Sequence, residues 1–137
     1  MSRCVVLDAE AMSALAGRTS PRQREVRAAL TAAARLGREA IVPALVLAEL
    51  YRGPARPLID ACLSRETGIQ VRVTDRSMAR LVGSVLAGAR AGSALIVDAH
   101  VVAAAVEAGG GIVLTSDPED LRRLSAPYRN VQVVDIR

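Results

Sequence analysis

Two patterns of apolar and polar positions along this chain predict strands. Short apolar runs, such as residues 4–7 and 112–114, are bounded by polar residues or glycines. Such runs are typical of strands buried in a parallel sheet, whereas strict alternation, as in residues 69–73, is typical of a half-buried strand. The pattern predicts strands at residues 4–7, 40–42, 69–73, 112–114 and 131–134.

Between these runs, apolar residues recur at the three- and four-residue spacing of an amphipathic helix. Capping residues mark the boundaries: Ser20 precedes Pro21, Gln23 is placed for a capping box, and Gly37 follows the same segment. We expect helices at residues 9–16, 20–36, 44–51, 57–66, 93–108 and 118–124, and another that runs from a cap at Thr74 or Asp75 to about residue 90.

Strands that alternate with helices predict an α/β fold. We expect a central, mostly parallel sheet of about five strands flanked by helices. No repeat or long linker interrupts the pattern, so residues 1–137 should form a single domain. In such sheets, ligands bind beyond the carboxyl ends of the strands, and residues that follow strands 4–7 and 112–114 should meet there.

Four carboxylates follow or interrupt the apolar runs. Asp8 follows the first strand, Asp117 comes soon after the strand at 112–114, and Glu49 and Asp98 lie within apolar helical stretches. Burying an unpaired carboxylate is costly, and the chain has no lysine that could neutralise one. If the four groups converge, they form a site suited to a hard divalent cation.

Two of these acids also have a structural explanation. Asp8 and Asp117 precede predicted helices, where Asp is a common N-cap, and Pro118 suits the first helical position. Three neighbouring side chains could cap the helix, add charge to its first turn, or support a site, namely Thr115, Ser116 and Asp120.

A structural explanation fits the other two acids less well. Glu49 could pair with Arg52 or Arg56 on the surface, although the helix around it is mostly apolar. Asp98 lies inside an apolar helical run for which Ser93 is the better start, so capping does not explain it. The joint pattern of four acids therefore indicates a site more strongly than any one of them does.

Composition adds a preference for anionic partners. The 137 residues carry a formal charge of +4 with a pI near 10.0, and all 18 basic residues are Arg. A basic chain favours nucleic acid, and with no Phe or Trp it should contact phosphates through arginine rather than stack on bases. The arginines at 18–38 form a solvated helix face or, as the alternative, an RNA contact.

Other reactive residues show no comparable pattern. Cys4 and Cys62 lack metal-site spacing, and only their number allows a disulfide. His100 lies two positions past Asp98 and would point away from it, which favours a structural or surface role. Glu10 is either solvated or an accessory acid. No apolar run is long enough for a signal peptide or a membrane span, so we expect a cytoplasmic protein without membrane contact.

The acids and their surroundings resemble the motifs of PIN-domain nucleases. Asp8 after the first strand resembles the first acid of that family, and residues 43–50, 98–105 and 115–121 resemble its next three elements in the same order. The resemblance spans essentially the whole chain and is greatest to the VapC toxins of bacterial toxin–antitoxin pairs. One departure is Ala9-Glu10, where such proteins often carry Thr or Ser.

The resemblance implies a PIN-like α/β fold and a Mg²⁺- or Mn²⁺-dependent endoribonuclease, the toxin of a type II toxin–antitoxin system. It further implies an RNA substrate, a homodimer, and a cognate VapB-like antitoxin that lays a segment near the acids. Carboxylate-bound Mg²⁺ can activate water and neutralise phosphate oxygens. We expect Asp8 and Asp98 as direct ligands, Asp117 as a direct or water-mediated ligand, and Glu49 as a further ligand or the residue that positions the water.

Two other classes of protein are alternatives. Receiver- or phosphatase-like domains also carry early acids, but they rely on a lysine, and P-loop NTPases need one as well. The remaining alternative is a catalytically silent PIN-like module that binds RNA or a protein. Replacing Asp8 with Asn separates the cases, because it should abolish cleavage by an enzyme and barely change RNA binding by a module.

Overall fold

The computed structural model describes residues 3–137, which form a five-stranded, entirely parallel sheet in the order β3-β2-β1-β4-β5. The prediction of an α/β fold with a mostly parallel sheet is confirmed, and each strand lies within one residue of its expected bounds. The strands are β1 (Cys4–Leu7), β2 (Ala40–Pro43), β3 (Ile69–Arg72), β4 (Gly111–Thr115) and β5 (Val131–Asp135).

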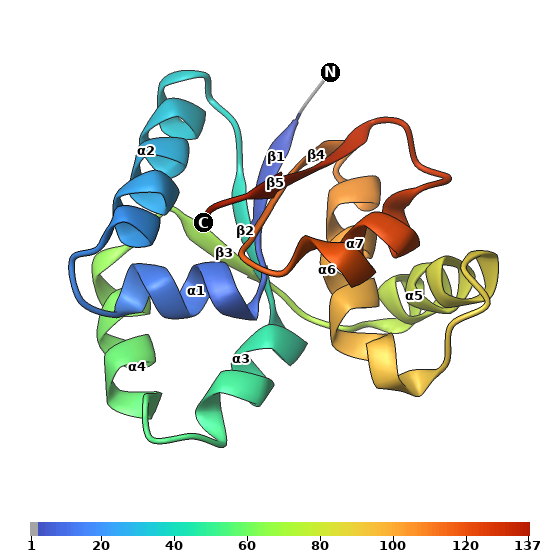
Figure 1. Ribbon diagram of the computed structural model, residues 1–137, viewed down its shortest axis with the longest axis horizontal. Coiled ribbons are helices and arrows are strands. Elements are labelled where there is room, and N and C mark those ends of the chain that lie inside the picture. The colour runs from blue at the N-terminus through green and yellow to red at the C-terminus, as the bar shows by residue number, and fades with distance from the viewer. Residues whose placement is uncertain (1–2) are drawn as a thin grey trace.

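Helices cover both faces of the sheet: α1, α2 and α4 lie on one side and α5, α6 and α7 on the other, while α3 lies below the strands (Figure 1). None of these helices is long and apolar enough to cross a membrane within residues 3–137. Their bounds are α1 (Ala9–Ala16), α2 (Pro21–Arg35), α3 (Ala44–Tyr51), α4 (Arg56–Arg65), α5 (Arg76–Gly88), α6 (Ile96–Glu107) and α7 (Pro118–Ser125).

The expectation of one continuous helix over residues 93–108 is wrong at its start. Ser93–Leu95 forms a separate 3₁₀ turn, η1, and the α-helix begins at Ile96. Leu95 has φ −104° and ψ 19°, outside the helical range, and Gly92 before the turn provides no capping side chain. Asp98 therefore lies in the first turn of α6, where the helix dipole favours a negative charge.

A core without Phe or Trp fills the space between sheet and helices. Every residue of β1 is buried, and α6 buries all its residues from Ala99 to Ala105 between the sheet and the neighbouring helices. His100 belongs to this buried segment, and its Nδ1 lies 2.7 Å from the carbonyl oxygen of Ile96. Its role is thus structural rather than on the surface. Cys4 and Cys62 are buried free thiols that do not form a disulfide.

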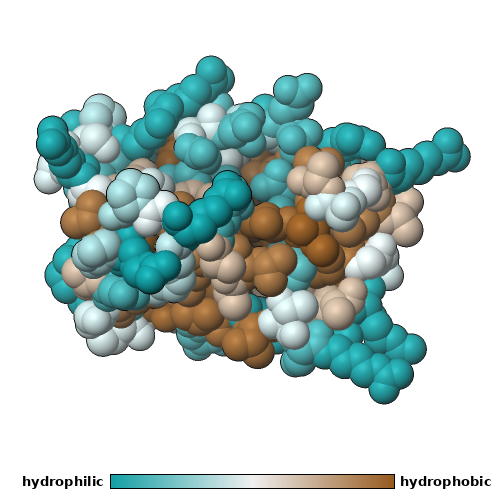
Figure 2. Space-filling model, turned by 90° about the horizontal axis from the view of Figure 1, so that it is seen from below, coloured by the Kyte–Doolittle hydropathy of each residue, from teal (hydrophilic) through white to brown (hydrophobic). Residues whose placement is uncertain are grey.

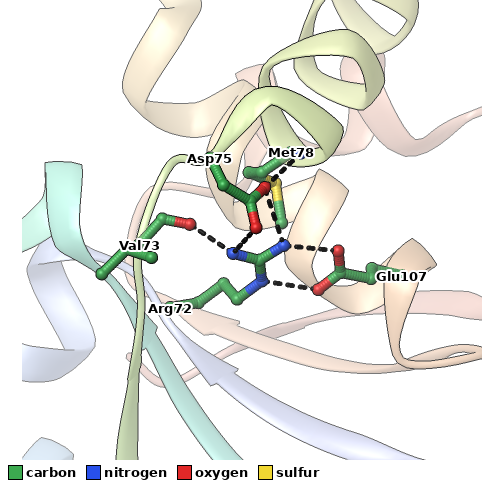
Figure 3. Close-up of polar contacts among 5 residues, drawn as sticks. All are labelled: Arg72, Val73, Asp75, Met78 and Glu107. Carbon is green, nitrogen blue, oxygen red and sulfur yellow. Dashed lines mark hydrogen bonds and ion pairs between the residues drawn. The ribbon is translucent and has the colours of Figure 1, made fainter.

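Arg72, at the end of β3, joins α5 to α6, two of the three helices on one face of the sheet (Figure 3). Its Nε and Nη2 donate to the two carboxylate oxygens of Glu107, each at 2.7 Å, and Nη2 lies 3.3 Å from Asp75 Oδ1. Asp75 also caps α5 by accepting from the backbone N–H of Met78 at 2.8 Å. Arg72 therefore fixes the N-terminus of α5 against the C-terminus of α6.

Replacing Arg72 with Met should lower the melting temperature by a few degrees, because a bidentate carboxylate pair and a contact between two helices are lost. Arg76→Met is the matched control: it removes the same charge from an exposed position that forms no ion pair within residues 3–137. Thermal unfolding followed by circular dichroism measures both. Equal melting temperatures for the two variants would contradict this role.

Candidate active site

The switch in strand order between β1 and β4 determines where the acids gather. Leu7 pairs with Leu114 in the sheet, so Asp8 and Thr115, the residues that follow them, leave neighbouring strands at the same level. The carboxyl ends of the strands point downward in Figure 1, toward α3 and the start of α6, which supply Glu49 and Asp98. Crevices at such switch points are the usual ligand sites of open α/β sheets.

Asp8 both caps a helix and carries a buried charge. Only 5% of its surface is exposed, and its Oδ1 accepts from the backbone N–H of Ala11 at 2.8 Å. Burial is the main cause that raises the pKa of Asp8 from 3.8 to about 6, and the charges of Glu10 and Asp98 add to it. Hydrogen bonds from Thr115 and Ala11 oppose the rise. Capping therefore does not compensate the cost of this charge.

Asp98 is the residue at which the acids converge. Its pKa is raised to about 6, first by burial and then by the charges of Asp120, Glu49 and Asp117. Every neighbouring charge that perturbs its pKa is negative. Asp8 and Asp98 also influence each other, because the charge of Asp98 contributes to the raised pKa of Asp8. A site built this way attracts a cation.

The loop between β4 and α7 connects two of the acids through Thr115. The Thr115 side chain is buried, its hydroxyl hydrogen-bonds to Asp8, and its Oγ1 accepts from the backbone N–H of Asp117 at 2.9 Å. Asp117 occupies the N-cap position of α7, yet its side chain makes no capping hydrogen bond. Capping therefore does not account for the exposed carboxylate of Asp117.

Glu10 lies closer to these acids than its sequence context indicated. It is exposed in the first turn of α1, and its Oε2 accepts a hydrogen bond of 3.1 Å from the Ser116 hydroxyl. The contact joins residues 106 positions apart. The two residues meet only because α1 lies beside the β4–α7 loop. The sequence alone therefore could not decide whether Glu10 is a solvated residue or an accessory acid.

A groove runs beside the acids between α3 and the start of α6, and we call it the α3–α6 groove. Its volume is about 520 Å³. Figure 2, which views the molecule from below, shows apolar surface across the middle of this face with hydrophilic groups around it. The groove is lined by Leu45, Ala48, Glu49, Arg52, Ser93, Ala94, Ile96, Val97 and Asp98.

The donor set suits Mg²⁺, but it does not form a closed cage. Within residues 3–137, no three His, Cys, Asp or Glu side chains lie close enough together to hold one ion. Mg²⁺ usually keeps several waters and takes one or two carboxylates. Asp8 and Asp98 fit this kind of binding, because the charge of Asp98 raises the pKa of Asp8 and no cation lowers the pKa of either acid. The exposed Glu49 and Asp117 fit contacts through water.

A family comparison agrees with this arrangement. The model of the PIN domain family matches residues 5–127. Because the match covers most of the chain, the protein belongs to the PIN domain family. The resemblance seen in the sequence is thereby confirmed, and the parallel sheet with its flanking helices is a PIN-like fold.

Solved structures with a similar fold include two toxin–antitoxin complexes. VapBC2 from Rickettsia felis, bound to a DNA fragment from its promoter, gives a TM-score of 0.66 at 12% identity over 96% of this chain and 98% of that one. VapBC-1 from nontypeable Haemophilus influenzae gives 0.60 at 14% identity over 97% and 98%. PAE2754 from Pyrobaculum aerophilum gives 0.52 at 19% identity over 98% and 92%. No curated protein matches the sequence.

The raised pKa values of Asp8 and Asp98 predict an unusual dependence of stability on pH. Both carboxyls move from 3.8 to about 6 on folding, so the folded state binds protons more tightly. Their stabilisation is therefore complete below pH 3.8 and is lost as the pH rises through about 6. We expect these groups to lower the free energy of unfolding, measured with urea in EDTA, by roughly 2 kcal/mol across this window.

Other carboxyl groups have lowered pKa values and change the stability with pH in the opposite direction. The contribution of the site is therefore measured by comparing the wild type with a variant. The pKa of Asp75 is lowered by the Met78 N–H and by Arg72, and that of Glu107 is lowered by Arg72. Their stabilisation is present above their ordinary pKa values and is lost as the pH falls. An Asp8→Asn/Asp98→Asn double variant isolates the contribution of the site. A wild-type decline no steeper than that of the double variant would contradict the prediction.

Proposed function

We propose that this chain is a metal-dependent endoribonuclease and the toxin component of a type II toxin–antitoxin system. The observation that carries the proposal is the convergence of buried Asp8 and half-buried Asp98, with three further acids around Asp98 and no cation among the charges that perturb either pKa. Membership of the PIN domain family and the likeness to two VapBC structures support it.

Bound Mg²⁺ or Mn²⁺ would supply positive charge for the phosphate oxygens and lower the pKa of a bound water. Asp8 and Asp98 are the residues that would hold the ion. Thr115 fixes the Asp8 carboxylate and the backbone of Asp117 by hydrogen bonds, so two acids from different strands keep their spacing. The exposed carboxylates of Asp117 and Glu49 are available to orient the attacking water.

Asp120 is the supporting residue with the largest influence. It is half-buried in the first turn of α7, and its charge is the largest electrostatic contribution to the raised pKa of Asp98. Ser116 supports the site from the same loop through its hydrogen bond to Glu10. Asp120 thus keeps the negative potential high where a cation would bind, whereas Ser116 holds the Glu10 carboxylate beside the loop.

A cognate VapB-like antitoxin and a homodimer complete the proposal. A site in which several acids gather suits an inhibitor that brings a positively charged side chain to it. Two of the structures with a similar fold are VapBC complexes, which supports a partner of this kind. If the product of an adjacent gene neither co-purifies with the protein nor inhibits it, this part of the proposal is wrong.

A catalytically silent PIN-like module that binds RNA or a protein is the second candidate. It is favoured by one observation, the absence within residues 3–137 of three acids close enough to share an ion. In that case the acids would serve only to bind a basic partner, and no divalent ion would be required.

Cleavage of total RNA by the purified protein separates the two candidates. Discrete fragments that form with Mg²⁺ or Mn²⁺, but neither in EDTA nor with Asp8→Asn, would establish the nuclease. Asn still caps a helix, so this variant should keep α1 intact. Glu25→Gln, at an exposed position on α2, is the matched control. Binding of RNA without cleavage, unchanged by Asp8→Asn, would establish the module.

A further inference from the structure

Arg52 lines the α3–α6 groove together with Glu49 and Asp98, yet it forms an ion pair with neither of them. It is exposed at the C-cap of α3, three positions after Glu49 on the same helix. The charges that perturb the pKa of Asp98 do not include it. Within residues 3–137, no ion pair or hydrogen bond engages its guanidinium, so the donors of this group are available to a ligand.

Nearby arginines differ from Arg52 in this respect. Arg56, four positions on, donates from Nε and Nη2 to the carbonyl oxygen of Tyr51 at 3.2 and 3.0 Å. Arg72 is held by Glu107 and Asp75. Both have structural roles that occupy their planar donor edge. Arg52 shares the groove with two acids and keeps this edge free, and a phosphate is an anion that such an edge binds through two parallel hydrogen bonds.

The rest of the groove is apolar and matches a different part of a nucleotide. Ile96 is 39% exposed, and Leu45 and Val97 contribute further apolar surface to the lining of the groove. Unstacked bases bind against apolar as well as aromatic side chains, and the chain has no Phe or Trp to offer. An apolar surface next to a free arginine suits one base with its phosphate.

We propose that the α3–α6 groove holds the RNA nucleotide next to the scissile phosphate, with Arg52 on its phosphate and Ile96 against its base. This assignment rests on the proposed nuclease function and names residues that position its substrate. RNA is the occupant because the groove includes Glu49 and Asp98, two of the acids that would act on the phosphodiester bond, so a strand that reaches these acids passes along the groove. Arg52 offers one phosphate of that strand a positive charge.

RNA binding without cleavage tests the role of Arg52. The probe is a fluorescein-labelled, single-stranded RNA of mixed sequence, and anisotropy is measured in EDTA at several salt concentrations on the Asp98→Asn background. Adding Arg52→Ala should weaken binding about tenfold and reduce the slope of log K against log salt by about 0.7, the value for one phosphate contact. Arg52→Lys should keep the slope and recover part of the affinity.

Each substitution has a matched control at the other edge of the sheet. Arg65, in the last turn of α4, is exposed and precedes the amino end of β3, so Arg65→Ala removes the same charge from the opposite edge of the sheet. Ile96→Ser should weaken binding about threefold without changing the salt slope, because it removes apolar contact and no charge. Leu36→Ser, at a residue that is 62% exposed, should change neither quantity.

Three outcomes overturn the assignment. If wild-type protein cleaves RNA with a divalent ion while Arg52→Ala and Arg65→Ala bind RNA alike, the nuclease stands and the role of Arg52 falls. If Arg52→Ala and Ile96→Ser instead leave RNA affinity unchanged and alter the molar mass in light scattering, the groove is an interface between copies of this chain. If the wild-type protein does not cleave RNA and the Asp98→Asn variant does not bind RNA, the proposed function is wrong, and this assignment is wrong with it.

Discussion

Replacing Asp98 with Asn should abolish RNA cleavage and at the same time stabilise the protein. Several kcal/mol of transition-state stabilisation depend on the ion that Asp98 would help to hold, so the rate should fall by about a thousandfold or more. The same change removes a half-buried charge that has only negative neighbours among the charges affecting its pKa. In EDTA near neutral pH, the free energy of unfolding of the Asp98→Asn variant should be about 1–2 kcal/mol higher than that of the wild type.

Two measurements on one preparation test this pair of effects. Cleavage is followed on total RNA with Mn²⁺, and stability by urea unfolding in EDTA. Glu25→Gln removes an acid from the exposed face of α2 and should leave both quantities near the wild-type values. If the Asp98→Asn protein were less stable than the wild type, or cleaved RNA at a similar rate, the electrostatic description of the site would be wrong.

Gly111→Ala should destabilise the protein by about 3 kcal/mol or more, through steric conflict between the two central strands. A Cβ at Gly111 would lie 2.6 Å from Cys4 Sγ and 3.0 Å from its backbone nitrogen, and would also clash with its carbonyl oxygen. Cys4 is paired with Gly111 in the β1–β4 ladder, so relief requires the strands to separate. Those strands position Asp8 and Asp117, and metal-dependent activity should fall as well.

Gly83→Ala is the matched control for this substitution. Gly83 lies in α5, and a Cβ there would meet no atom within 4 Å. Alanine has the higher helix propensity, so Gly83→Ala should stabilise the protein by roughly 0.5–1 kcal/mol. Urea unfolding compares the two variants directly. Similar unfolding midpoints for Gly111→Ala and the wild type would show that β1 and β4 have more freedom than their packing implies.

The strands and most helix boundaries could be predicted because local chemistry specifies them. The apolar run before Asp8 predicts a buried strand, and the capping residues Ser20 and Asp75 both accept the backbone hydrogen bonds expected of them. The start of α6 could not be predicted, because Ser is a residue type that commonly caps helices, yet Ser93 makes no capping hydrogen bond. The break into η1 therefore has no signal in residue type alone.

The four acids could be identified from the sequence because each lies where an apolar context makes a carboxylate costly. Their individual environments could not be predicted. Asp8 is buried and Asp98 half-buried, whereas Glu49 and Asp117 are exposed, although all four follow or interrupt apolar runs. The strength of the Asp120 contribution and the contact between Glu10 and Ser116 were likewise invisible, since each joins segments distant along the chain.

The sequence by itself determined the elements, the parallel α/β class and the set of acids, because periodicity, capping and the cost of burying charge act over a few neighbouring residues. The tertiary structure alone decided which acids share one electrostatic environment, that Thr115 links Asp8 to Asp117, and that Arg52 and Asp98 line the same groove. These relations depend on the order of strands and the placement of helices, where contacts join residues far apart in the chain.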